Sequence, residues 1–144
     1  FVWYRVALRL RHLFLGMNFH YLYISRKAVF VSCLYDLSDY ELELVFSDTI
    51  GYTPRQLLSS LALEEDEMLQ AFCADELDEP LDSGKRVRFY DRIRSSSLAK
   101  ILLEKSGEAR RLLLSYLRQE GFLGSEKPGI VDIGWKGNTN RVLN

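Results

Sequence analysis

The chain lacks clustered cysteine, which removes one common class of metal site. Its 144 residues include two cysteines, and they do not have the close spacing of a zinc knuckle. Cys33 and Cys73 both lie among apolar residues on helical patterns, so we predict that both are buried, reduced thiols. Reduced thiols of this kind favour a cytoplasmic location.

The chain also lacks a strong net charge and a long apolar run. Its formal net charge is −1, which gives no reason to expect a broad field for nucleic acid or membrane, so any charge effect must be local. Residues 1–15 are apolar but carry Arg5, Arg9, Arg11 and His12. They form neither a signal-peptide core nor a membrane span, which needs about 20 apolar residues. We therefore predict no membrane span.

Several catalytic and binding motifs are missing as well. His12 and His20 are separated by a predicted element boundary, with no cysteine nearby, which argues against zinc. There is no Ser-His-Asp set and no Gly-x-Ser-x-Gly elbow. Residues 53–69 could form a helix-turn-helix, but its second half is acidic where a DNA-reading helix is basic. We therefore predict no nucleic acid partner.

The patterns that are present predict an α/β fold. The sequence suits one domain, since domains most often hold roughly 100–150 residues. It opens with Phe1 inside a helical pattern, so we expect a piece of a longer protein. We predict a small parallel Rossmann-like sheet portion with a large, mostly α-helical insertion between its two strands. Residues 1–35 would form helix, strand and helix, residues 36–125 the insertion, and residues 126–144 a strand, a loop and the start of a helix.

The two predicted strands are short apolar runs rich in β-branched and aromatic residues, at 21–24 and 130–133. Between them, Ser38 and Glu41 predict a capping box at the start of a helix. Thr53 followed by Pro54 predicts a second helix start.

Further helices are predicted along the insertion. Residues 64–77 continue as one helix with acids at its start. Residues 85–94 fit either a helix or a short strand. Ser106 is predicted to open the last long helix, and Gly121 to end it.

Asp132 is the strongest candidate for chemistry. It lies at the carboxyl end of a predicted strand, and open α/β sheets bind ligands in the crevice beyond such ends. Asp132 could be a magnesium ligand or a general base, or it could cap the following turn or helix. Gly134 and Gly137 would let backbone amides approach an anion closely.

Ser25 occupies the matching position after the first predicted strand, with Arg26 and Lys27 directly behind it. A serine hydroxyl at a helix start can bind a phosphate oxygen together with free amides and nearby cations. Considered alone, Ser25 is more often an N-cap. Its pairing with Asp132 favours a shared phosphate site.

The glycine turn contains further candidates for ligand contacts. Trp135 could stack on a sugar or base, or pack under its own loop. Lys136 could neutralise a phosphate or be solvated. Asn138 and Thr139 could line a polar pocket, although Asn138 could also cap the last helix.

These residues together resemble a known family. Residues 21–28 (Tyr-Leu-Tyr-Ile-Ser-Arg-Lys-Ala), the stretch 53–63 and residues 130–137 (Ile-Val-Asp-Ile-Gly-Trp-Lys-Gly) are similar to bacterial proteins described as predicted haloacid-dehalogenase-like hydrolases. Those proteins often occur with glycosyltransferases that build polysaccharides. The resemblance implies that Ser25 binds phosphate, that Asp132 binds magnesium, and that the aspartate nucleophile lies outside this chain. Asn138 interrupts the family pattern, in which Thr or Ser follows the second glycine directly.

The resemblance implies part of a phosphohydrolase or phosphotransferase module linked to surface polysaccharide biosynthesis, with magnesium and phosphate bound at the two strand ends. Its substrate would be a phosphorylated small molecule or a nucleotide sugar. A non-catalytic module that binds a nucleotide sugar or a partner glycosyltransferase is the alternative. A phosphoribosyl-type site at the last strand is a weaker third hypothesis, since one acid replaces the usual pair.

Overall fold

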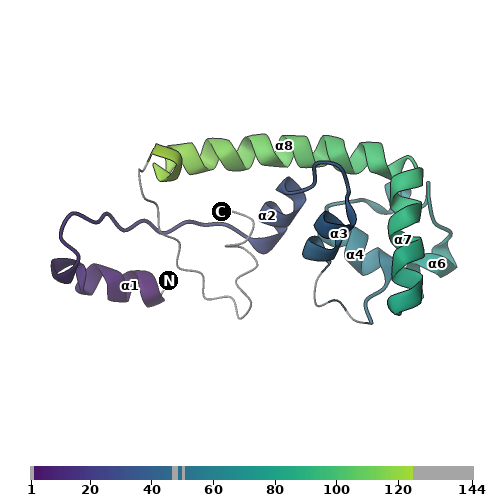
Figure 1. Cartoon of the computed structure of the whole chain (residues 1–144), viewed down its shortest axis with the longest axis horizontal. Coiled ribbons are helices and arrows are strands. Elements are labelled where there is room, and N and C mark those ends of the chain that lie inside the picture. The colour runs from purple at the N-terminus through teal and green to yellow at the C-terminus, as the bar shows by residue number, and fades with distance from the viewer. Residues whose placement is uncertain (1, 47–48, 50, 125–144) are drawn as a thin grey trace.

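The chain is helical in all of the regular structure that the computed structural model describes, which covers residues 2–46, 49 and 51–124. Figure 1 shows one long helix, α8, running along the molecule, with the helical body gathered under its first half and α1 lying apart at the other end. The elements are α1 (Val2–Arg9), η1 (Arg11–Leu13), α2 (Arg26–Ser32), α3 (Asp39–Val45), α4 (Pro54–Ser60), α5 (Glu65–Met68), α6 (Ala74–Asp78), α7 (Ser83–Ser95), α8 (Leu98–Gln119) and η2 (Phe122–Gly124).

The predicted α/β fold with a Rossmann-like sheet is wrong for these residues, because none of them forms a strand. Residues 21–24 have the composition of a strand but no strand beside them in the described part of the chain. Instead, the backbone N–H of Tyr23 donates to the Tyr116 hydroxyl of α8 at 2.8 Å. A strand needs hydrogen bonds from a neighbouring strand, which local composition cannot supply. The second predicted strand, 130–133, lies outside the described residues.

The predicted helix starts are confirmed where a side chain caps the first turn. The Ser38 hydroxyl accepts from the Glu41 backbone N–H at the start of α3, which confirms the helix start. The predicted capping box is not complete, because the Ser38 N–H donates to the Asp36 carboxylate rather than to Glu41. Thr53 forms a full capping box with Gln56, with Pro54 in the first turn of α4. The Asp82 carboxylate accepts the Lys85 backbone N–H at the start of α7. Residues 85–94 lie within this helix and do not form a strand.

Two other helix predictions are corrected. Residues 64–77 form two short helices, α5 and α6, rather than one. The last helix does not begin at Ser106, since α8 runs unbroken from Leu98 to Gln119. At its end, Gly121 adopts the left-handed conformation with φ +74° that commonly closes a helix.

The core lies between α8 and the shorter helices. Phe46, at the end of α3, is completely buried. Its ring centroid lies 5.8 Å from that of Phe89 and 6.0 Å from that of Tyr90, both on α7. Leucines from α4, the α6 region and α8 complete this apolar core: Leu57, Leu58, Leu61, Leu77, Leu98 and Leu102. The helical body therefore has a core of its own, independent of any sheet.

Polar contacts fasten α2 to α8. The Ser106 hydroxyl, fully buried, donates to the Leu34 carbonyl at 2.6 Å. The Arg110 guanidinium donates to the Ser32 carbonyl at 2.9 Å and to the Leu34 carbonyl at 2.5 Å. The Cζ atom of the Arg110 guanidinium lies 3.4 Å from the centroid of the Tyr35 ring. We call this set, Ser106 and Arg110 with the carbonyls of Ser32 and Leu34, the α2–α8 clamp.

The connection between α2 and α3 is held by a single carboxylate. The Glu41 side chain accepts the backbone N–H groups of Tyr35, Asp36 and Leu37, at distances between 2.9 and 3.2 Å. Leu37 has a positive φ of 58°, which is costly for a leucine and needs such support. The Glu41 carboxylate therefore has a structural role.

Candidate functional site

Ser25 lies at the start of α2 and acts as its N-cap. Its hydroxyl oxygen accepts the backbone N–H of Ala28 at 3.1 Å, with φ −89° and ψ 150°. Arg26 is the first residue of α2, and Lys27 is exposed on the same turn. The N-cap interpretation of Ser25 is thus confirmed, while a phosphate role stays a prediction.

Capping by Ser25 has a measurable consequence. Replacing Ser25 with Ala should lower the free energy of unfolding by about 1 kcal/mol, because one amide of the first turn loses its acceptor. Ser25→Asp should keep nearly all the stability, since aspartate caps as well as serine. Urea unfolding of the three proteins measures this. Equal destabilisation by both substitutions would show that the hydroxyl does something other than capping.

The remaining predicted site residues lie outside the described residues. They are Asp132, Gly134, Trp135, Lys136, Gly137, Asn138 and Thr139. The shared site of Ser25 and Asp132 is therefore still a prediction.

The cysteines differ from each other, and one prediction about them is wrong. Cys33 is half-buried and donates to the Val29 carbonyl at 2.9 Å, and burial raises its pKa to about 11. Cys73 is exposed rather than buried, at the start of α6, where Glu76 accepts both its backbone N–H and its thiol. Its apolar neighbours in the sequence belong to a turn that leaves the thiol at the surface. Within the described part of the chain, no group of three or more histidine, cysteine or acidic side chains could hold a metal.

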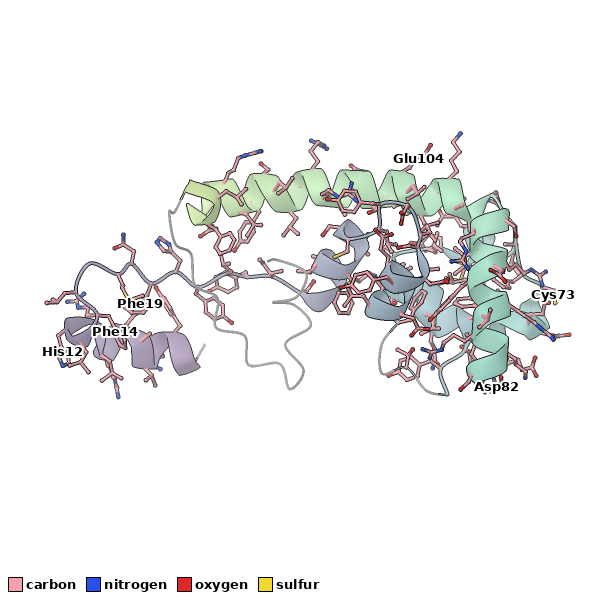
Figure 2. The ribbon with its side chains drawn as sticks, viewed as in Figure 1. His12, Phe14, Phe19, Cys73, Asp82 and Glu104 are labelled. Atoms are coloured by element: carbon pink, nitrogen blue, oxygen red, sulfur yellow. The ribbon has the colours of Figure 1, made fainter. Side chains whose placement is uncertain are left out.

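A groove on the helical body combines apolar and charged side chains. It has a volume of about 310 Å³ and opens between the start of α4, α6 and α7. Buried apolar side chains of Pro54, Phe72, Leu81 and Phe89 form its floor. Its charged lining consists of Glu76, Glu79, Lys85, Arg88 and Arg92. In Figure 2, the labels Cys73 and Asp82 mark this end of the molecule.

Two of the three cations in the groove are paired with acids. Lys85 forms an ion pair of 2.5 Å with Glu79, which raises the pKa of the lysine. Arg92 forms an ion pair of 2.7 Å with Glu76. Its guanidinium also donates to the Ala71 carbonyl and lies 5.0 Å from the centroid of the Phe72 ring. The Cys73 N–H and thiol, followed by Arg92, hold the pKa of Glu76 below its ordinary value. Glu76 is therefore ionised at neutral pH.

Arg88 is different, because it is exposed and has no hydrogen bond or ion pair within the described residues. It lies on α7 one turn after Lys85 and one turn before Arg92. The groove can thus offer one unpaired guanidinium beside an apolar floor, with carboxylates at its edge. This arrangement can bind an anion that also carries hydroxyl groups.

Sequence reasoning missed this groove. The spacing of Lys85, Arg88 and Arg92 places the three cations on one face of a helix. The residue pattern of 85–94 fits either a helix or a strand, so it does not by itself predict that face. The capping residue Asp82 was the signal that would have found it.

Comparison with known proteins found no family model, no curated protein and no solved structure that matches the chain. The resemblance to haloacid-dehalogenase-like hydrolases therefore rests on the motif residues alone. No described helix is long and apolar enough to cross a membrane.

Proposed function

We propose that the helical body, α2 to α8, is a non-catalytic binding module for a nucleotide sugar, and that the groove of α4, α6 and α7 receives it. The observation that carries this proposal is Arg88, an exposed cation beside a buried apolar floor. Among the described residues it forms no ion pair, and its acidic neighbour Asp82 acts on it only through a longer-range Coulombic interaction. An unpaired guanidinium is a strong, bidentate phosphate donor.

The rest of the groove suits the other parts of such a ligand. The side-chain oxygens of Glu76 and Glu79 can accept hydrogen bonds from sugar hydroxyls, and the rings of Phe72 and Phe89 underlie the groove. Its volume of about 310 Å³ lies at the lower end of the roughly 300–1,000 Å³ of small-molecule sites. It would hold the sugar phosphate, with the base at the open side.

The cellular setting comes from the resemblance. A haloacid-dehalogenase-like protein of surface polysaccharide biosynthesis would work in the cytoplasm, beside a glycosyltransferase that uses nucleotide sugars. The catalytic hypothesis, with Asp132 on magnesium and the nucleophile outside this chain, is the second proposal. It requires magnesium-dependent phosphatase activity in the protein extended by its upstream residues, and Asp132→Asn should abolish that activity.

Titration calorimetry with UDP-glucose as the probe tests the binding module. We expect binding that weakens at least tenfold in Arg88→Ala, since one charge-assisted phosphate contact contributes about 1.5–3 kcal/mol. Arg111→Ala is the matched control, because Arg111 is an exposed arginine of α8 with only a distant ion pair, 3.9 Å to Glu108. No heat of binding at millimolar probe, or equal weakening by both substitutions, overturns the proposal.

A further inference from the structure

Positive charge is concentrated at the start of the chain. The first 35 residues carry five lysines and arginines and no aspartate or glutamate, and the first acid is Asp36. The other 109 residues carry 14 lysines and arginines against 20 acids. The net charge of −1 therefore conceals a segment of charge +5 joined to a body of charge −6.

The same segment exposes apolar side chains. Val6 and Leu10, one helical turn apart, are 38% and 39% exposed. Leu13, Leu15 and Met17 follow, and they are 65%, 90% and 61% exposed. Arg5 and Arg9 lie one turn apart on the neighbouring row of α1. Apolar and cationic rows thus run side by side.

The helical body does not cover this surface. α1 packs chiefly against η1, and Figure 1 shows both at the end of the molecule opposite α7. Two ring contacts of this segment join residues that precede α2: Tyr4 with Tyr21, and Phe14 with Phe19, each at 5.7 Å between centroids. Figure 2 shows His12, Phe14 and Phe19 gathered at this end.

We propose that residues 2–17, comprising α1, η1 and the turn after them, lie in the interface of an anionic lipid bilayer. A helix with an apolar row, arginines beside it and no acids is the pattern of an in-plane interfacial helix. The apolar side chains enter the boundary between headgroups and acyl chains, while Arg9 and Arg11 contact lipid phosphates. Residues 36–144, which carry the net charge of −6, face away from the anionic membrane. This inference is independent of the nucleotide-sugar groove, which lies at the opposite end of the helical body.

The exposed apolar side chains favour an anionic lipid surface over nucleic acid as the occupant. Nucleic acid would be attracted to the arginines but would leave Leu13, Leu15 and Met17 in water. A bilayer interface accommodates both kinds of side chain at once.

Co-sedimentation with vesicles tests the proposal. The full chain should bind vesicles of phosphatidylcholine mixed with phosphatidylserine, and should bind vesicles of phosphatidylcholine alone at least tenfold more weakly. The double substitution Arg9→Glu with Arg11→Glu should reduce binding at least tenfold, because each side chain changes from attraction to repulsion. Leu13→Ser with Leu15→Ser should reduce binding to both kinds of vesicle.

The matched control is Arg111→Glu with Arg118→Glu, two exposed arginines of α8. It makes the same change in net charge on the helical body and should leave vesicle binding unchanged. Circular dichroism verifies that each variant is folded. Absence of binding to phosphatidylserine vesicles at low salt overturns the proposal, and so does equal weakening by the control. UDP-glucose binding should be the same in the Arg9 and Arg11 variant as in the parent chain, so the two proposals can fail separately.

Discussion

Replacing Phe46 with Ala should lower the free energy of unfolding by about 3–5 kcal/mol, the range of buried aromatic truncations. Phe46 has no exposed surface, and its ring contacts those of Phe89 and Tyr90. Loss of the ring leaves a cavity where α3 meets α7, and helices fixed by their neighbours cannot close it completely. A total stability of about 5–15 kcal/mol is typical of domains, so this single change should bring the helical body near its unfolding limit.

Tyr40→Ala is the control for this substitution. Tyr40 is also an aromatic residue of α3, but it is 65% exposed. Its removal should change the stability by less than about 0.5 kcal/mol, as surface substitutions usually do. Guanidinium unfolding followed by circular dichroism compares the two. Similar losses for Phe46→Ala and Tyr40→Ala would contradict the placement of Phe46 in the core.

Local signals in the sequence predicted helix starts correctly, because the contacts that make a cap lie within four residues. Ser38 and Thr53 each accept a backbone N–H three residues ahead. The same signal failed at Ser106. Its hydroxyl donates to the Leu34 carbonyl, 72 residues away, and α8 continues past it. A serine hydroxyl that is bonded to a tertiary acceptor does not cap the start of a new helix.

The predicted sheet failed for a related reason. Residues 21–24 have the β-branched and aromatic composition of a strand, but a sheet exists only through pairing with a second strand. Nothing in four residues specifies that partner, and the described part of the chain supplies none. The cap at Asp82 predicts the helix that carries the cations of the groove. The groove itself does not follow from local sequence, because its acids come from α6 and the loop after it.

Arg110 should show the other large effect on stability, through the α2–α8 clamp. Arg110→Met removes charge-assisted hydrogen bonds to the Ser32 and Leu34 carbonyls, where such bonds contribute about 1.5–3 kcal/mol. It also removes the guanidinium from the face of the Tyr35 ring, 3.4 Å from its centroid. We expect a loss of about 2–4 kcal/mol when the cation–π contact is included. Arg110→Lys should recover less than half, because an ammonium cannot reach both carbonyls in the planar geometry of the guanidinium.

Hydrogen exchange shows where the stability is lost. If the clamp fastens α2, the amides of α2 should exchange faster in Arg110→Met while those of α4 and α7 change less. Arg111→Met, on the exposed side of α8, should leave both sets unchanged.

A double-mutant cycle with Ser106→Ala then separates the two members of the clamp. Arg110 and Ser106 share the Leu34 carbonyl, and the Arg110 guanidinium also donates to the Ser106 hydroxyl at 3.2 Å. Residues in one hydrogen-bond network couple by about 0.5–3 kcal/mol, so the two losses should not add. Strict additivity would mean that each residue acts alone, and that α2 is held to α8 by apolar packing rather than by the clamp.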